Sequence, residues 1–178
     1  MVRATSNRSK LEKLGVKNFV IGDLMDKSSL REALTPKHGF DAIVASAAGY
    51  TRHSKGDNAE TDTVGYRNLV DATKEAGIPR FVLISILERD KAVKVPHFHN
   101  KYLTEKYLAE KHQPFIAHRP RAFFDLSDDL MLKKIEKGIV PVFFEEVDYG
   151  TIYTPDLARY AAIAVVSVPD TELAGVSR

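Results

Sequence analysis

Lys101 is the side chain in this sequence whose type and position best suit acid–base chemistry. It comes just before a helical pattern over residues 102–112, and it follows an apolar run over residues 81–86 that has Ser85 near its end. A lysine in a partly desolvated cleft has a lowered pKa and can serve as acid or base. The alternative is a surface ion pair with Glu105, four residues further along the helix. The choice between the two depends on how the flanking elements place Lys101.

The flanking elements are two short apolar runs, residues 81–86 and 115–117, joined by a crossover that holds a helix. Such runs, which carry few charges, are expected to form parallel strands buried on both faces of a sheet. Ligands of open parallel sheets sit beyond the carboxyl ends of the strands. We therefore expect Ser85, Lys101 and Ala122 at or near that edge, and we expect the function to be decided there.

The rest of the chain alternates between strand and helix patterns in the same way. Further strands are expected at residues 2–5, 18–21, 41–46 and 140–144. Further helices are expected from about residue 9, from about residue 28, after the polar loop 50–60, from residue 127 and from residue 154. The third of these helices has an inward face of Gly65, Leu69, Ala72 and Ala76. This alternation predicts an α/β fold with a mostly parallel sheet.

Several helix starts carry capping signals. Ser9 and Glu12 fit a capping box, in which the serine oxygen accepts from a free backbone N–H while the glutamate reaches back. Asp26 or Ser28 can cap the next helix. Thr154, which a proline and an acidic residue follow, is expected at the cap of the last helix.

Composition limits the classes of function. The chain has 178 residues, of which 44% are apolar and 28% charged, as in one soluble domain with a real core. A net charge of +2 without a dense Lys/Arg block argues against a nucleic-acid partner. The start lacks the apolar core of a signal peptide, and the apolar stretch 160–168 is shorter than the ~20 residues that span a bilayer. We expect a cytoplasmic protein with no membrane partner.

The absence of cysteine and the scatter of histidine restrict the chemistry further. Without cysteine, disulfides and thiolate chemistry are excluded. His97 and His99 lie two apart in an expected loop without an evident third ligand, so no metal site is expected. Arg52, His53 and Lys55 form a small basic loop that either meets a phosphate or is solvated.

The order of short motifs resembles the short-chain dehydrogenase/reductase superfamily, specifically its atypical, NmrA-like branch of NAD(P)-binding proteins. The matching motifs are Gly22-Asp23-Leu24, residues 41–44 leading to Ala47-Ala48, residues 68–72, residues 77–85, Lys101 with Glu105, residues 114–120 and residues 156–158. The resemblance implies a Rossmann-like sheet flanked by helices, as a single NAD(P)-binding domain over residues 1–178.

One motif of that superfamily is missing from the sequence. The glycine-rich turn GxxGxxG, whose backbone amides hold the pyrophosphate, does not occur. The chain is therefore expected to start at the second strand of the family, with the first, central strand of the usual sheet order absent. The substrate-binding C-terminal portion is also expected to be short.

The resemblance implies cofactor contacts at the N-terminal half of the chain. Ser6, Asn7 and Arg8 follow the first expected strand, where the family contacts the adenosine ribose. No acidic residue occurs there to bind the ribose hydroxyls of NAD. The forked guanidinium of Arg8 therefore favours the 2′-phosphate of NADP. A solvated helix start is the alternative. Asp23 with Leu24 resembles the family's acid beside the adenine, or Asp23 forms a turn.

The resemblance implies that the nicotinamide end of the cofactor lies near the segments that follow the strands at 41–46 and 81–86 and near the helix that carries Lys101. Ala47 and Ala48 give a small-residue edge that suits either close cofactor approach or tight packing. Lys101 matches a lysine that contacts the nicotinamide ribose or assists proton transfer. Ser85 either matches a hydroxyl near the nicotinamide or is an ordinary serine at the end of a strand. His97 takes the position of the family tyrosine, where it either donates a proton near neutral pH or has no role.

Two other tyrosines match the superfamily pattern Tyr-x-x-x-Lys by sequence alone. Tyr102 and Tyr107 are each followed by a lysine four residues later, but both lie inside the helix, beyond the family lysine. Tyr107 shares an inward stripe with Leu103, which predicts core packing.

Three functions are compatible with these patterns. The first is an NADP-dependent reductase that delivers a hydride to a small organic substrate. The second is a non-catalytic NADP-binding regulator that senses the cofactor, and the third is an inactive, truncated family member. The sequence identifies neither the substrate nor an oligomeric state.

Overall fold

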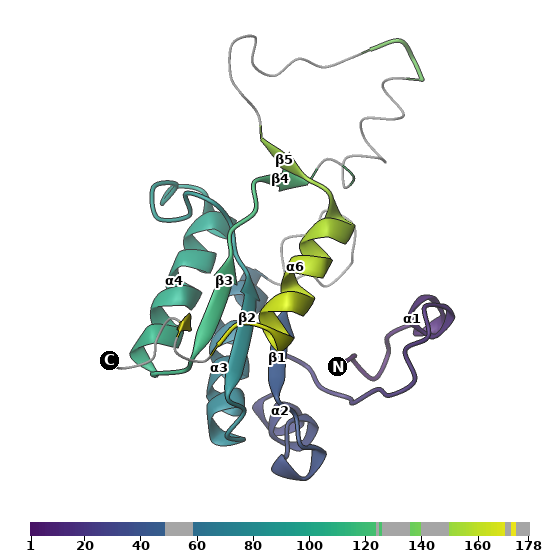
Figure 1. The fold of residues 1–178 in the computed structure, drawn as a ribbon, viewed down its shortest axis with the longest axis vertical. Helices are drawn as coiled ribbons and strands as arrows, with labels where there is room; N and C mark the ends of the chain where they lie inside the picture. Colours follow the sequence, from purple (N-terminus) through teal and green to yellow (C-terminus); the bar gives the residue numbers. More distant parts are fainter. Residues whose placement is uncertain (49–58, 124, 126–135, 140–149, 170–171, 174–178) are drawn as a thin grey trace.

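The computed structural model describes residues 1–48, 59–123, 125, 136–139, 150–169 and 172–173 (Figure 1). Most of the helix expected at 127–137 and the strand expected at 140–144 lie outside the described residues. The described helices are α1 (Ser9–Lys13), α2 (Lys27–Ala33), the short 3-10 helices η1 (Pro36–His38) and η2 (Ala59–Asp62), α3 (Val64–Glu75), α4 (Pro96–Glu110) and α6 (Thr154–Val166). The strands are β1 (Ala42–Ala45), β2 (Arg80–Ile84), β3 (Phe115–His118), β4 (Ala122–Phe123) and β5 (Thr151–Ile152).

The central sheet has the order β1-β2-β3, and both of its strand pairs are parallel. Val82 on β2 is in register with Val44 on β1 and with Ile116 on β3. The expected parallel pairing of the apolar runs at 81–86 and 115–117 is therefore confirmed. Strands β4 and β5 form a separate parallel pair beyond the carboxyl ends of the central strands (Figure 1).

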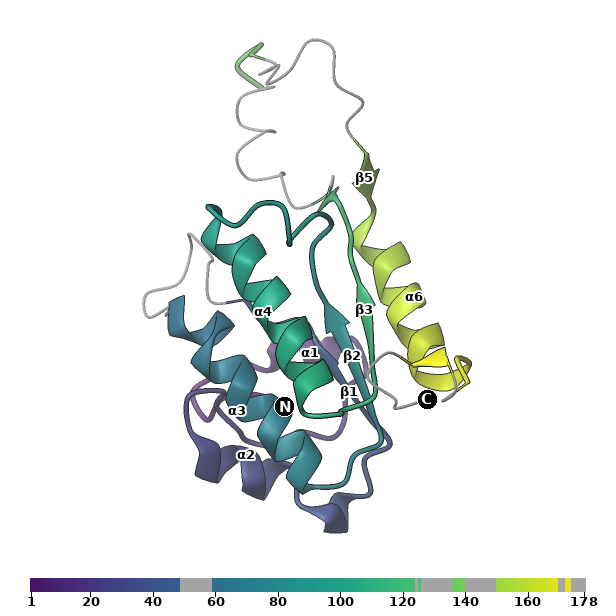
Figure 2. The same cartoon turned by 90° about the vertical axis from the view of Figure 1, so that its left-hand side faces the viewer.

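Helices cover both faces of this sheet. Figures 1 and 2 show α3 and α4 on one face and α6 on the other. Successive residues of a strand point to opposite faces, so Phe81 and Leu83 enter the core under α3 and α4, whereas Val82 packs with Ala161 and Ala164 of α6. Because β2 is buried on both sides, an uninterrupted apolar run is the sequence that this position requires.

Arg80, at the start of β2, forms hydrogen bonds with the end of α6. Its guanidinium donates hydrogen bonds to the backbone carbonyls of Ala164 and Val165 at 2.9 and 2.6 Å and to Val168 at 2.8 Å. The last carbonyls of a helix have no partner within the helix and carry partial negative charge. A cation at the start of β2 thus neutralises the end of the helix that packs on β2.

Helix α4 starts at Pro96, six residues before the start expected at residue 102. Proline is well suited to the first helical position because its missing N–H would have no helical partner there. The expectation that His97 and His99 lie on a loop is therefore wrong, since both belong to the first turn of α4. Lys101 lies well inside the helix.

Two of the expected caps differ in the structure. Helix α1 has Arg8 at its cap without a side-chain hydrogen bond, and the Ser9 N–H donates to Asn7 Oδ1 instead of a capping box forming. Helix α6 has Tyr153 at its cap, and Thr154 is its first helical residue. The Thr154 hydroxyl and N–H donate to Asp125 Oδ1 at 2.8 and 3.1 Å. The expected Asp26 cap of α2 is confirmed: Asp26 Oδ1 accepts from the next two backbone N–H groups.

The N-terminal segment contributes no strand to the central sheet. The strands expected at 2–5 and 18–21 are reduced to a single parallel bridge between Val2 and Ile21. Among the described residues, β1 pairs with β2 alone, so no neighbour joins Val2 and Ile21 to the sheet. A cavity of about 610 Å³ lies there, lined by Met1 and Val20 on one side and by residues 42–47 on the other.

The helices of the described part are all too short or too polar to cross a bilayer.

Candidate functional site

Lys101 lies at the carboxyl edge of the central sheet, as the sequence predicts. It projects from the second turn of α4, and only 7% of its surface is exposed. Its Nζ donates to the Tyr66 hydroxyl at 3.0 Å and to the backbone carbonyl of Ala47 at 3.3 Å. Ala47 follows the end of β1 and Tyr66 comes from α3, so three elements meet at one amine.

Tyr66 completes this cluster with a short hydrogen bond of its own. Its hydroxyl donates to the Ala47 carbonyl at 2.5 Å, and its ring lies 4.2 Å from Lys101 Nζ, within the range of cation–π attraction. The tyrosine is 1% exposed. The Ala47 carbonyl thus accepts hydrogen bonds from both Tyr66 and Lys101.

Burial controls the protonation of both groups. Removal from water lowers the pKa of Lys101 to about 8 from 10.5, and the nearby Asp62 carboxylate opposes this shift. Burial also raises the pKa of Tyr66 above its ordinary value, and Asp62 adds to that rise. Near neutral pH the site therefore holds a protonated tyrosine and a lysine that can gain or lose a proton with little cost.

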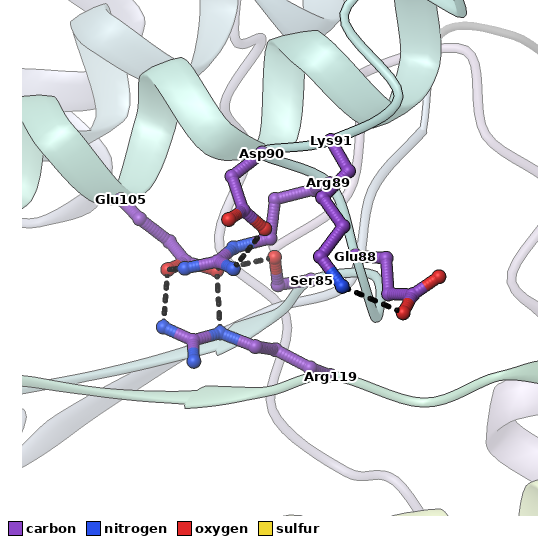
Figure 3. A network of polar contacts seen from close by, with 7 residues as sticks. All are labelled: Ser85, Glu88, Arg89, Asp90, Lys91, Glu105 and Arg119. Atoms are coloured by element: carbon purple, nitrogen blue, oxygen red, sulfur yellow. Dashed lines mark hydrogen bonds and ion pairs between the residues drawn. The ribbon is translucent and has the colours of Figure 1, made fainter.

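Glu105, one turn after Lys101, belongs to a separate network (Figure 3). Arg89 donates to its carboxylate at 2.8 and 2.6 Å, and Arg119 donates at 3.1 and 2.6 Å, so two guanidinium groups share one carboxylate. Burial alone would raise the pKa of Glu105, but the hydrogen bonds from Arg119, Arg89 and Ser85 outweigh it and hold the pKa below its ordinary value. The arginines, and not Lys101, are its ion-pair partners among the described residues.

Ser85 also belongs to this network (Figure 3). The residue is 2% exposed, and its hydroxyl donates to Glu105 Oε1 at 2.6 Å. The structure therefore places Ser85 at the carboxyl end of β2 as expected, with its proton directed at a buried carboxylate. Ser85 joins the strand to α4, next to the turn that carries Lys101.

His97 lines a second cavity, of about 520 Å³, beyond the ends of β2 and β3. The wall of this cavity also includes Ser85, residues 86–88, Phe98, residues 120–123 and Gly150. The His97 ring meets the Phe98 ring edge-on at 4.8 Å between ring centroids. Ser85 and His97 therefore line one cavity, while Lys101 contacts the Ala47 side of the sheet edge.

Leu24 and Ala47 line the 610 Å³ cavity together with residues 42–46 of the sheet edge. Helix α3 holds the turn that carries Leu24, because Asn68 Nδ2 donates to the Leu24 carbonyl at 2.9 Å. Gly65 permits this close approach: a Cβ there would lie 3.0 Å from Leu24 Cβ. The structure thus brings together two of the residues expected to bind cofactor, from turns more than twenty residues apart.

Asp23 and Ala48 flank these two residues. Asp23 Oδ1 accepts from the Met25 N–H at 2.9 Å, so this carboxylate forms the turn that was the alternative to an adenine contact. Ala48 is exposed next to Ala47.

Ser6, Asn7 and Arg8 lie apart from this group, on the segment that leads into α1 (Figure 1). The side chains of Ser6 and Asn7 accept backbone hydrogen bonds from Arg3 and Ser9. The Arg8 guanidinium lies 5.5 Å from the centre of the Phe19 ring. The structure therefore gives these three residues local contacts and does not place them beside Lys101.

Tyr66 is the residue of this site that the sequence patterns missed. The motif Tyr-x-x-x-Lys directs attention to Tyr102 and Tyr107, yet the Tyr107 hydroxyl bonds Asp71 and the Tyr102 ring faces the cations of Arg89 and Lys106. The tyrosine that meets Lys101 comes from another helix, 35 residues earlier. The one available signal was the inward-facing position of Tyr66 beside Gly65 on α3.

The chain matches one protein family and two curated relatives. Residues 1–117 match the model of a family described as NAD(P)H-binding. The photosystem II assembly factors Ycf39 of Cyanophora paradoxa and of a Synechocystis strain are 27% and 26% identical over 93% of this chain. The chain spans 50% and 49% of the length of these relatives.

Similar solved structures include two reductases. A triphenylmethane reductase of Citrobacter sp. superposes with a TM-score of 0.74 at 19% identity, over 92% of this chain and 53% of that chain. The NADPH-dependent quinone oxidoreductase QOR2 of Escherichia coli, complexed with NADPH, gives 0.68 at 21% identity, over 92% and 54%. The expected Rossmann-like, mostly parallel sheet is confirmed by these likenesses.

Proposed function

The chain belongs to the NAD(P)H-binding family, and we propose that it works as an NADPH-dependent reductase of a small organic substrate. The observation that supports this most is the placement of Lys101. A lysine that is 7% exposed at the carboxyl edge of a parallel sheet lies where such sheets bind their ligands. Its pKa of about 8 suits proton exchange near neutral pH.

The residues present fit the two ends of a dinucleotide. Leu24 and Ala47 line the 610 Å³ cavity, and their chain neighbours Asp23 and Ala48 lie beside them. Lys101 would hold the nicotinamide end through the N–H that Tyr66 and Ala47 leave available. Bound NADPH would supply the hydride.

The chain's own residues then have distinct roles. In this proposal Lys101 exchanges a proton with the substrate or orients the ribose. His97 is a proton donor from the wall of the 520 Å³ cavity, which would hold the substrate. Ser85 contacts the nicotinamide only if it leaves Glu105, so we assign its main effect to the position of α4.

The preference for NADPH over NADH is assigned to the N-terminal segment. Ser6, Asn7 and Arg8 offer two polar side chains and a guanidinium fork, and the segment between Val2 and Lys10 contains no acid. A 2′-phosphate suits this set better than a bare ribose hydroxyl. The contact requires Arg8 to leave the Phe19 ring, on which it lies in the structure.

A non-catalytic role is the second candidate. The curated relatives that match 93% of this chain are named as assembly factors and not as reductases. A cofactor-binding protein of that kind would bind NADPH through the same residues without turnover. The two candidates agree on cofactor binding and differ in the fate of the hydride.

Substitution of Lys101 separates the two candidates. We expect Lys101→Ala to weaken NADPH binding less than tenfold and to lower NADPH oxidation by 10²-fold or more, as for loss of a proton-transfer group. The matched control is Lys106→Ala, an exposed lysine of the same helix. The measurement follows nicotinamide absorbance with a soluble quinone and a triphenylmethane dye as acceptors. NADPH binding without oxidation in the unmodified chain would favour the non-catalytic role, and equal losses of binding and turnover in Lys101→Ala would refute the proton-transfer role.

A further inference from the structure

We propose that Tyr66 is a positioning residue, which holds the Lys101 ammonium against the Ala47 carbonyl at the sheet edge; this inference rests on the function proposed above. The three groups come from α3, α4 and the turn after β1. Their contacts form a closed triangle of hydrogen bonds, with Nζ to hydroxyl at 3.0 Å, hydroxyl to carbonyl at 2.5 Å and Nζ to carbonyl at 3.3 Å.

The directions of these hydrogen bonds follow from the donors that each group has. A carbonyl only accepts, so the single hydroxyl proton of Tyr66 is directed at Ala47. The Tyr66 oxygen is then an acceptor toward Lys101, which brings three N–H donors. Two of these donors have partners among the described residues, which leaves the third for a ligand at the sheet edge.

The hydroxyl, and not the ring, carries this role. A phenylalanine at position 66 would fill the same volume between α3 and the sheet, so the ring alone accounts for the burial of this residue. Lysine has four rotatable methylene bonds and adopts one orientation only when its amine is held. Tyr66 supplies that restraint at the oxygen, and the ring face 4.2 Å from Nζ adds attraction for the charged form.

No other side chain described in the structure competes for this amine at hydrogen-bond distance. Glu105, the residue four positions later, is held by Arg89 and Arg119. Asp62 faces the pair as a nearby charge that favours protonated Lys101. Tyr66 is therefore the hydroxyl whose loss should change Lys101 specifically.

The test compares Tyr66→Phe with Tyr107→Phe. The second substitution also removes one hydroxyl from the α3–α4 region, but that hydroxyl donates to Asp71 and not to the Lys101 cluster. Lysine side chains labelled with ¹³C report the titration of Lys101 by NMR, and Lys101→Met assigns the signal. Loss of an acceptor disfavours the ammonium, so we expect Tyr66→Phe to lower the Lys101 titration midpoint by about half a unit or more. Tyr107→Phe should leave it unchanged. A Lys101 titration identical in both variants would overturn the proposal.

Addition of NADPH to the same samples keeps this inference separate from the proposed function. We expect the Lys101 signal of the unmodified chain to shift on NADPH addition, and the shift to be at least halved in Tyr66→Phe. A signal that ignores NADPH in the unmodified chain contradicts the proposed function, and the titration comparison still decides the role of Tyr66. If Tyr66→Phe does not fold, the reciprocal measurement follows the Tyr66 ring carbon that bears the hydroxyl. It should shift in Lys101→Met and not in Lys106→Met, and the absence of that shift refutes the contact.

Discussion

Ser85 donates a 2.6 Å hydrogen bond to Glu105, and this bond ties the end of the central strand to the helix that carries Lys101. Glu105 also accepts hydrogen bonds from two guanidinium groups, that of Arg89 in the loop after β2 and that of Arg119, the residue after β3 (Figure 3). The network therefore fixes α4 against the sheet edge one turn away from the candidate site. The stability of this network therefore determines how rigidly α4 holds Lys101 at the sheet edge.

Glu105→Gln should destabilise the protein by about 3 kcal/mol, because it leaves Arg89 and Arg119 without their shared carboxylate. The pKa of Glu105 is lowered in the folded state, so its contribution is present above the ordinary value of 4.5 and is lost as the pH falls through the folded value. Urea unfolding over a pH series that starts at pH 7 and extends well below the ordinary value of 4.5 measures both effects. Glu110→Gln, at an exposed position of the same helix, should change stability by less than about 0.5 kcal/mol.

Lys101 should give the protein a distinctive alkaline pH dependence. Its pKa is lowered from 10.5 to about 8, so between these values the unfolded chain binds a proton that the folded chain does not. The stability of the protein should therefore fall as the pH drops from 10.5 to 8, by about 3 kcal/mol in total for this group. The free energy of unfolding of Lys101→Met, compared with that of the unmodified chain from pH 7 to 10, should lack this slope. Parallel curves for the two proteins would show that Lys101 is not desolvated.

Gly65→Ala should disturb the turn that holds Leu24. The new methyl group would lie 3.0 Å from Leu24 Cβ, closer than carbon atoms normally approach, so the turn must move. We expect a loss of about 1–2 kcal/mol in stability and a weaker affinity for NADPH, measured by unfolding and by nicotinamide fluorescence. Val64→Ala, an exposed neighbour on α3, serves as the control. Unchanged NADPH affinity in a destabilised Gly65→Ala protein would separate this turn from the cofactor site.

Arg80→Met should loosen α6. The substitution keeps the apolar stem but removes two hydrogen bonds to the last carbonyls of the helix and one to the Val168 carbonyl just beyond it, so we expect a cost of about 2 kcal/mol. Hydrogen exchange should become faster in residues 161–166, while the amides of β3 keep their protection. Equal acceleration in both elements would indicate global destabilisation and no specific role at α6.

The central strands and the sheet edge could be predicted from the sequence because their signal is local. Residues 81–84 are apolar without interruption, which is what a strand covered by helices on both faces requires. Proline gives an ambiguous local signal, since it ends helices and also starts them. The start of α4 at Pro96 was therefore misplaced, although the position of Lys101 near the edge was predicted correctly.

The contacts of the site could not be predicted, because they join residues far apart in the chain. Tyr66 and Lys101 are 35 residues apart on different helices, and their meeting depends on how α3 packs against α4. The partners of Glu105 likewise come from two separate loops, 16 and 14 residues away. The N-terminal strands failed to form for a similar reason: a strand pattern needs a neighbour, and the described residues offer Val2 and Ile21 only each other.

The most direct test of the account is a titration of the purified 178-residue chain with NADPH and with NADH, followed by nicotinamide fluorescence and by thermal melting. The account predicts saturable binding that prefers NADPH and a melting temperature that rises with NADPH concentration. It also predicts that Arg8→Ala reduces the preference for NADPH by about tenfold, as for loss of one charged hydrogen-bond partner. A cooperatively folded chain that binds neither nucleotide would contradict the central claim that this edge of the sheet is a dinucleotide site.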